Sequence, residues 1–368
     1  MPPPLLPKTQ TAYIQTANGT LKLTPSAPLP HIPADRMLVR VIAVALNHCD
    51  WKMPSRFPCE GVVNGTDYAG IIVSIGSEVA NLPTKPAWKV GDAIFGACHG
   101  ANPVDPQSGA FAEYLRADPE LVFRKPQGMS WETAAAIGCS GIATLGLALF
   151  WKGGMELSGS PENPVTAEDA EEVLVYAGST SVGTMAIQLL RIYGHKPIVT
   201  CSPHNFALVK SYGADTVFDY HSPTCGEEIR QHTNNDLEYV LDPIVEAPTQ
   251  RICYRAIGRA GGRYIALEAW QPMNHTRPSV EPAFIMGPAI IGSHSPLPNG
   301  YGFEADAEKR AFGIAFYAQI QKLLDERRLR AHPVRVIDGK WQGILEGLEM
   351  LKNKGVSGQR LVVLLSQP

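Results

Sequence analysis

A loop of small residues near the middle of the chain could hold phosphate groups. The apolar run Val173 to Tyr176 is followed by the loop Ala177 to Gly183, and a helical pattern of apolar residues then begins. A strand that enters a helix through such a loop brings backbone N–H groups and a helix N-terminus to one point, which suits the pyrophosphate of a dinucleotide. Ser181 stands where the G-x-G-x-x-G fingerprint often has its middle glycine, so an ordinary strand-to-helix turn is the alternative interpretation.

Polar residues follow the next expected strand, 197–200, and could recognise the ribose of the same dinucleotide. An Asp or Glu at this place would bind the 2′-hydroxyl of NAD, but neither occurs between Cys201 and Asn205. Ser202, His204 and Asn205 offer neutral or weakly cationic groups instead, which suit a 2′-phosphate. The sequence therefore predicts NADPH rather than NADH, although His204 could equally be a surface histidine in a polar turn.

These motifs lie in a segment where strands and helices alternate, from about 141 to 295. Six strands of a parallel sheet are expected there, at 173–176, 197–200, 216–219, 239–242, 262–267 and 289–291, and 152–172 reads as an exposed loop. Before this segment, β-branched runs at 37–46, 68–75, 92–95 and 109–115 alternate with Gly and Pro turns and predict a β-rich domain, 1–140. The elements expected after residue 296 do not continue the βα pattern. They are helices at 308–328 and 341–353 and strands at 332–337 and 360–365. We therefore expect 296–368 to complete the first domain.

The composition is typical of a soluble enzyme. The chain has 368 residues, 45% of them hydrophobic, which is enough for two domains, and its net charge of −3 argues against nucleic acid or an anionic membrane as partner. The longest apolar stretch, Thr133 to Trp151, is interrupted by glycines and predicts a buried helix, and the first ten residues lack the apolar segment of a signal peptide. Seven scattered cysteines form no C-x-x-C pair. We expect a cytoplasmic monomer with reduced thiols.

Four segments carry a resemblance to the medium-chain dehydrogenase/reductase superfamily. They are NHCDWK at 47–52, GTDYAGIIVSIG at 65–76, VGD at 90–92 and GAFAEY at 109–114, in matching order and spacing. The resemblance implies an α/β protein with a GroES-like β-barrel domain, completed by the C-terminus, and a Rossmann domain, a doubly wound parallel sheet of six strands that binds NADP at 141–295.

The same resemblance bears on metal binding. Zinc-dependent alcohol dehydrogenases of this superfamily have Gly-His-Glu where this chain has Gly65, Thr66 and Asp67, and only Cys98 is present where they carry four structural cysteines. Without that histidine the ligand set of a catalytic zinc is incomplete. Cys49 could remain from a ligand position, but a buried thiol is the favoured interpretation. We therefore expect a zinc-independent enzyme with no bound metal.

Within the zinc-free branch the chain resembles the trans-acting enoyl reductases that serve fungal polyketide synthases. The segments that carry this are LVYAGST at 174–180, TCSPHNF at 200–206, VFDY at 217–220, AIGRAGG at 256–262 and VSG at 356–358. The resemblance implies which residues bind the cofactor and the substrate. For the cofactor they are His48, Cys49, Asp50 and Trp51 beside the nicotinamide, Ser179, Thr180, Ser181 and Val182 at the pyrophosphate, Cys201, Ser202, Pro203, His204 and Tyr220 at the 2′-phosphoadenosine, Ala266 and Leu267 at the nicotinamide pocket, and Val356 and Ser357 in the closing segment; for the substrate they are Thr144, Ile285, Met286, Gly287, Pro288 and Ala289.

Lys52 is the candidate catalytic residue. Reduction of an α,β-unsaturated thioester requires a hydride at Cβ, stabilisation of the enolate oxygen and a proton at Cα. An ammonium group could interact with the developing negative charge or deliver the proton, directly or through water. The alternative for Lys52 is a solvated surface lysine.

Three functions remain open from the sequence. The first is an NADPH-dependent enoyl reductase acting on a thioester that a polyketide synthase carries, for which Arg259, Arg263, Arg327, Arg328 and Arg330 are possible docking charges or simply solvated. The second is a quinone or enone oxidoreductase acting on free small molecules, and the third is a non-catalytic NADPH-binding scaffold.

Overall fold

The chain divides into two compact units. The computed structural model describes residues 6–82, 86–270 and 272–367, so half of the N-terminal stretch expected to lack a signal peptide lies outside the described residues. The first unit comprises Met1–Ser140 with Ile291–Pro368, and the second comprises Gly141–Ile290. The sequence places the return to the first unit at 296, whereas the contacts place it at Ile291.

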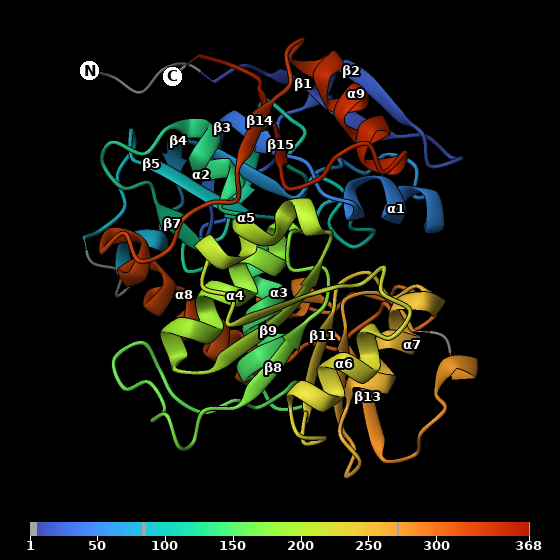
Figure 1. Cartoon of the computed structure of the whole chain (residues 1–368). Helices are drawn as coiled ribbons and strands as arrows, with labels where there is room; N and C mark the ends of the chain where they lie inside the picture. The colour runs from blue at the N-terminus through green and yellow to red at the C-terminus, as the bar shows by residue number, and fades with distance from the viewer. Residues whose placement is uncertain (1–5, 83–85, 271, 368) are drawn as a thin grey trace. The chain divides into compact units, whose positions relative to one another are not determined.

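The second unit is built on a six-stranded parallel sheet in the order β10-β9-β8-β11-β12-β13. Figure 1 labels β8, β9, β11 and β13 of this sheet. The order reverses direction between β8 and β11, as in a doubly wound Rossmann sheet, which confirms the predicted fold. The strands are β8 Glu172–Val175, β9 Lys196–Cys201, β10 Thr216–Asp219, β11 Tyr239–Asp242, β12 Gly262–Ala266 and β13 Val280–Phe284, and the helices are α4 Ser181–Tyr193, α5 Phe206–Ser211, α6 Cys225–His232 and α7 Ala247–Ala256.

The prediction for the sixth strand is wrong. Residues 289–291 belong to a 3-10 helix, η5 Gly287–Ile291, and the sixth strand is β13. Pro282 lies in the middle of β13 and argues against a strand in the sequence, because proline cannot donate to a ladder. The structure accommodates it because β13 is the edge strand and pairs on one side only, with β12.

The first unit contains a seven-stranded sheet in the order β14-β15-β3-β4-β5-β7, with β6 also paired to β3. The C-terminal strand enters this sheet because Val362 pairs with Ala45 in antiparallel register. The elements are β3 Met37–Ala45, α1 Cys49–Arg56, β4 Asp67–Ile75, β5 Ala93–Ala97, β6 Tyr114–Ala117, β7 Val122–Arg124, α8 Ala307–Asp325, β14 Val334–Val336, α9 Trp341–Lys352 and β15 Arg360–Leu364; a separate hairpin is formed by β1 Thr9–Gln15 and β2 Leu21–Pro28.

Two other predictions need correction. The strand expected at 109–115 begins only at Tyr114, because Ala110 and Phe111 donate their N–H groups to Gly65 and Asn64 in a loop. The loop 152–172 is mostly exposed but is held by Met155 and Leu157, which are buried.

The apolar stretch after residue 130 is helical, as predicted. It consists of α2 Trp131–Ala136, α3 Cys139–Leu145 and a π-helical turn, Gly146–Phe150. By length and composition alone, Trp131–Phe150 could cross a membrane, but 72% of its most apolar window is buried within the protein. Burial of that extent is typical of the core helix of a globular domain.

Candidate functional site

The predicted cofactor residues of the second unit gather at one edge of its sheet. All six strands are parallel, so their carboxyl ends lie at the same edge. Ser179 follows β8, Ser202 follows β9, Tyr220 follows β10 and Leu267 follows β12. Ligands of open α/β sheets bind at this edge, beside the point where the strand order reverses.

The phosphate loop is held by its own hydrogen bonds and by the neighbouring strand. Thr180 caps α4: its hydroxyl accepts from Gly183 N at 3.1 Å and donates to Ala177 O at 2.9 Å. Thr200 in β9 accepts from Ala177 N through its hydroxyl and from Gly178 N through its carbonyl oxygen, at 3.2 and 2.9 Å. The first turn of α4, which holds Ser181 and Val182, thus has a fixed position, and N–H groups of a first turn have no partner within the helix.

The glycine requirement of this loop falls on Gly178 rather than on position 181. A Cβ at Gly178 would lie 2.2 Å from Val199 Cγ1, so a side chain there would push the loop off β9. Ser181 is already the first residue of α4 and is half-buried. The departure from the glycine fingerprint therefore lies at a position that the local geometry lets a serine occupy.

Ser202 and Tyr220 are brought together where the 2′-phosphoadenosine is expected. The Ser202 hydroxyl donates to the Tyr220 hydroxyl at 3.1 Å, because β9 and β10 pair with Cys201 opposite Asp219. Cys201 itself is buried, whereas Pro203 and His204 are exposed in the 3-10 turn that follows it.

Asp219, the last residue of β10, lies next to Tyr220 in the sequence, and the sequence reasoning gave it no role of its own. Its carboxylate accepts from His221 N at 3.0 Å and from the His221 ring at 2.7 Å, and these contacts lower the pKa of Asp219. The carboxylate beside Tyr220 is thus engaged by His221. The signal that could have found Asp219 and His221 is a run of polar residues at the end of an apolar strand.

The remaining predicted residues of this unit lie along the same edge. Ile285 N donates to Ala266 O at 3.0 Å. This hydrogen bond joins the segment expected to bind the nicotinamide, at Ala266, to the segment expected to bind the substrate, at Ile285. Met286 follows Ile285, and Gly287, Pro288 and Ala289 belong to η5. Thr144 lies one turn after Gly141 in α3, and a Cβ at Gly141 would be 3.8 Å from Val182 Cγ2, so α3 passes the start of α4.

In the first unit, α1 carries the predicted nicotinamide-side residues and Lys52. His48 is its N-cap, and Cys49 to Lys52 form its first turn. Asp50 is 2% exposed and accepts from Asn47 N at 2.8 Å and from the Thr66 hydroxyl at 3.0 Å. Burial raises the pKa of Asp50 to about 7. Asp50 therefore fixes the turn that begins α1, which is the structural alternative to a direct role.

Trp51 and Lys52 differ in their surroundings. Trp51 packs against the core of the first unit. Lys52 is half-buried, and its Nζ lies 6.0 Å from the centroid of the Trp51 ring. The ammonium group is thus positioned along an aromatic side chain that the core holds in place.

A buried ion pair that the sequence reasoning missed holds the loop before α1. Arg360 in β15 donates to Asp67 at 2.5 Å, and their side chains are 6% and 1% exposed. Asn47 Nδ2 donates to the same carboxylate at 2.8 Å, and Ser140 N donates to it at 2.8 Å. The last residue of the Gly-Thr-Asp triplet thus links the residue before His48, the C-terminal strand and the end of the N-terminal segment.

Two positive charges of the C-terminal segment lie near His48, whose side chain reaches the surface. Desolvation, with the positive charges of Lys52, Arg360 and Lys354, lowers the pKa of His48 to about 4, so its imidazole is neutral at physiological pH. Val356, two residues beyond Lys354, packs against the core, and Ser357 is exposed. The structure thus brings the predicted closing segment to the same region of the first unit as α1.

The thiols beside Asp67 are protonated. Burial raises the pKa values of Cys49 and Cys98 well above the ordinary value, and Cys98 donates to Gly65 O at 3.6 Å. Within residues 6–82, 86–270 and 272–367, no three His, Cys, Asp or Glu side chains are grouped so as to hold a metal ion. Absence of a metal from the protein stays a prediction.

The fold implies a nicotinamide dinucleotide, and the residues present fit one. The pyrophosphate would meet the first turn of α4, and the adenosine would meet Ser202, His204 and Tyr220. The hydroxyl groups of Ser202 and Tyr220 and the imidazole of His204 can donate hydrogen bonds, and none of these three side chains carries a negative carboxylate.

Comparison with known proteins identifies the family. The alcohol dehydrogenase GroES-like domain family matches residues 33–127, and the zinc-binding dehydrogenase family matches 181–299. The trans-enoyl reductase ffsC of Aspergillus flavipes is 52% identical, covering 98% of this chain and 97% of its own, and the trans-enoyl reductase ccsC of Aspergillus clavatus is 48% identical, covering 97% of each. A crystal structure of an alcohol dehydrogenase superfamily protein from Novosphingobium aromaticivorans superposes with a TM-score of 0.75 at 20% identity, over 97% of this chain and 100% of that one. Because the two identities near 50% extend over almost all of each chain, the protein belongs to the trans-enoyl reductases of the medium-chain dehydrogenase/reductase superfamily.

Proposed function

We propose that the protein uses NADPH to reduce an α,β-unsaturated polyketide thioester carried by a polyketide synthase, as a step of secondary-metabolite biosynthesis. The observation that carries this proposal is full-length identity of about half to trans-enoyl reductases. The hydroxyl pair Ser202 and Tyr220, followed by His204, supports NADPH over NADH, because these groups can donate to a 2′-phosphate.

The residues of the chain have separate tasks in this reaction. Bound NADPH supplies the hydride that is added to Cβ of the substrate. The Lys52 ammonium stabilises the negative charge that develops on the thioester oxygen and holds the proton that Cα receives. Asp50 and the Asp67–Arg360 pair position α1, and with it Lys52. The hydride at Cβ and the proton at Cα together convert the double bond into a single bond.

The surroundings of the enzyme are also proposed. A substrate tethered to a synthase calls for a partner that binds transiently, since the chain is handed on after each reduction. All seven cysteines are free thiols, which supports a reducing compartment such as the cytoplasm. We further propose a monomer that works without membrane or nucleic acid.

The test is NADPH oxidation by the purified protein. We expect turnover of a simple enoyl thioester, followed by the loss of nicotinamide absorbance, and reduction of the same acyl chain when a synthase carries it. Turnover of free quinones but not of the thioester would replace this function with the second alternative. Tight NADPH binding with no turnover of either substrate would favour the scaffold.

A further inference from the structure

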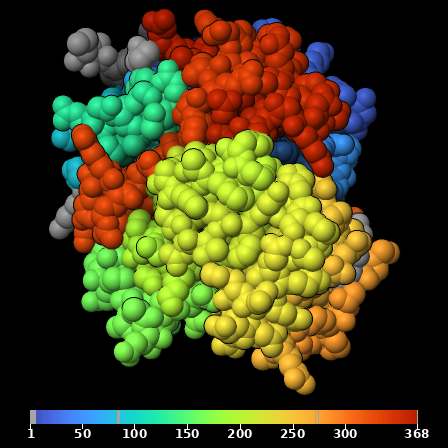
Figure 2. All heavy atoms as spheres, in the orientation of Figure 1, coloured from blue at the N-terminus to red at the C-terminus, as the bar shows by residue number. Residues whose placement is uncertain are grey.

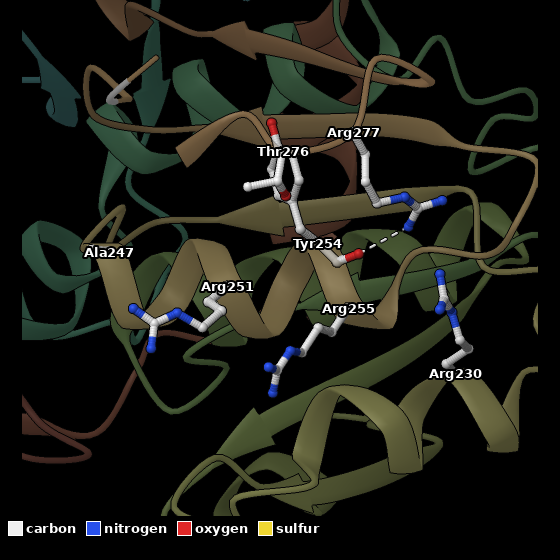
Figure 3. A pocket seen from close by; sticks show the side chains of 7 residues that line it. All are labelled: Arg230, Ala247, Arg251, Tyr254, Arg255, Thr276 and Arg277. Atoms are coloured by element: carbon white, nitrogen blue, oxygen red, sulfur yellow. Dashed lines mark hydrogen bonds between the residues drawn. The ribbon is translucent and has the colours of Figure 1, made fainter. Parts of the chain in front are cut away.

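Five arginines line two adjoining hollows on the second unit, and none of the predicted cofactor residues lines either hollow. Arg251 and Arg255 project from α7, Arg230 from α6 and Arg277 from the segment before β13, and all four line one hollow. In Figure 3 the guanidinium groups of Arg230 and Arg277 lie near each other, whereas those of Arg251 and Arg255 extend to the other side of the view. An adjoining hollow adds Arg259 and Ser279, and the two have volumes of about 370 and 400 Å³. Arg259 precedes β12 and Ser279 precedes β13, so this basic hollow reaches the amino edge of the sheet, opposite the cofactor edge.

Two of these arginines have a structural task. Arg230 and Arg277 both donate to Ile257 O, at 2.6 and 2.8 Å, and Arg277 also donates to Tyr254 O and Gly258 O. They thereby satisfy carbonyl groups at the C-terminus of α7. Desolvation, followed by the positive charge of Arg230, lowers the pKa of Arg277.

The other arginines are not explained by the fold. Arg251 and Arg259 are exposed, and neither forms an ion pair or a side-chain hydrogen bond within the part of the chain that the structure describes. Arg255 is one turn after Arg251 on α7 and reaches Glu227 at 3.4 Å, with both side chains more than half exposed. Like charges four residues apart destabilise a helix, and the exposed ion pair of Arg255 with Glu227 offsets this repulsion only in part.

The charges of the hollow differ in sign from the protein as a whole. The chain has a net charge of −3, yet five arginines line these two hollows, and Arg255 is the one that pairs with a carboxylate, Glu227, among the described residues. Met273, 83% exposed, lies in the 3-10 turn Pro272–Asn274, which contacts α7. Arginine and methionine are both enriched at protein interfaces. Figure 2 shows residues of the range 200–240, coloured yellow-green to yellow, at the surface of the second unit.

We propose that the basic hollow docks an acidic surface of the protein that delivers the tethered substrate. This rests on the proposed function and names the surface involved. Among the arginines that the sequence suggested, Arg259 belongs to it, whereas Arg263 donates to Gly154 O and Glu156 and Arg328 pairs with Glu326. Opposite charges accelerate encounter without requiring tight binding, which suits a partner that must leave after each cycle.

The test uses a fluorescent oligoglutamate peptide as probe and the full-length protein. The variant Arg251→Glu/Arg259→Glu is compared with Arg327→Glu/Arg335→Glu, which makes the same change in net charge at two exposed arginines of the first unit. We expect the first variant to bind the peptide at least tenfold more weakly, the control to bind as the wild type does, and salt to weaken wild-type binding.

Three results would overturn the proposal. If both variants lost the same amount of affinity for the peptide, or if neither lost any, the peptide would not bind in the hollow. Displacement of the peptide by low concentrations of inorganic phosphate would show a small-anion site. Preference for a single-stranded oligonucleotide over the peptide would show a nucleic-acid surface.

A second measurement separates this proposal from the proposed function. The hollow variant should turn over a small free enoyl thioester at the wild-type rate but reduce the synthase-bound chain at least tenfold more slowly. Failure of the wild type to reduce any thioester would contradict the proposed function, while the peptide titration would still decide on docking. If the hollow variant reduced the synthase-bound chain at the wild-type rate, that result would contradict docking.

Discussion

Arg360 and Asp67 form an almost completely buried ion pair across 293 residues of sequence, with 2.5 Å between guanidinium and carboxylate. In a zinc-dependent relative the residue before Asp67 would be a metal-binding histidine, whereas Thr66 here hydrogen-bonds Asn47 and Asp50. The loop that leads into α1 is thus held by a buried ion pair and by hydrogen bonds to Thr66 and Asp67.

Removal of one partner of this pair should destabilise the first unit strongly. Arg360→Met leaves the Asp67 charge buried without its cation, and we expect a loss of about 3–5 kcal/mol in the free energy of unfolding. Urea denaturation measures it. The double variant Asp67→Leu/Arg360→Met removes both charges and should lose less than the sum of the two single variants; additive losses would show that the pair is not coupled.

Lys52 should be required for turnover but not for cofactor binding. Lys52→Ser and Lys52→Met should each lower turnover of an enoyl thioester by about 10²-fold or more, the range for a positioned acid, with little change in NADPH affinity. Met keeps the length and apolar stem of the lysine. Activity retained by Met but lost by Ser would assign Lys52 to packing, and full activity in both would shift the proton to a bound water or to Thr144.

NADPH should bind more tightly than NADH, through the donors after β9. Each charge-assisted hydrogen bond to the 2′-phosphate contributes about 1.5–3 kcal/mol, so Ser202→Asp should weaken NADPH binding by about 10- to 100-fold and affect NADH less. Fluorescence titration measures both dissociation constants. Ser158→Asp, the same change on an exposed loop of this unit, is the control. Equal wild-type affinities for the two cofactors would contradict the assignment.

Asp50 should make the stability of the protein fall as the pH rises. Its pKa is about 7 in the folded protein against 3.8 for an ordinary aspartate, so the folded state holds the extra proton between these values. The contribution is most favourable below pH 3.8 and is lost toward pH 7, at no more than about 1.4 kcal/mol per pH unit.

The matched variant for this prediction is Asp50→Asn. Histidines such as His48, His99 and His332, with pKa values lowered to about 4, contribute with the opposite sign. They are present in both proteins, so they cancel in the difference between wild type and variant. Urea midpoints across this pH range should show the wild type losing stability relative to the variant as pH rises, and a constant difference would contradict the prediction.

The purified protein should contain no stoichiometric metal. The buried thiols of Cys49 and Cys98 have raised pKa values, which disfavours the thiolate form that zinc requires. Elemental analysis of untagged protein provides the measurement. Zinc at one equivalent, lost together with activity on chelation, would show that the prediction is wrong.

Local patterns predicted the elements of the second unit well. The strands at Thr216–Asp219 and Tyr239–Asp242 have the predicted bounds, because each is a short apolar run between turn residues. The strand containing Pro282 was missed because its edge position, which makes a proline tolerable, is a property of the sheet and not of the segment.

The candidate site was predictable where its residues follow strand ends and not where distant segments meet. Ser202 and Tyr220 were found in this way. The pairing of Arg360 with Asp67 has no local signal, since it depends on the C-terminal strand lying beside β3. The basic hollow was equally hidden, because its arginines come from three separate segments and only Arg259 was among those suggested.

Pro282 also affects how this sheet could meet another copy of itself. Ile285 N and the carbonyl of Ser279 bond to β12, and amide directions alternate along a strand, so the nitrogen of Pro282 faces the free edge. That edge lacks a donor at its centre. A strand from a second molecule that aligned there would leave one of its carbonyl groups without a bond, so β13 is a poor template for joining two sheets into one.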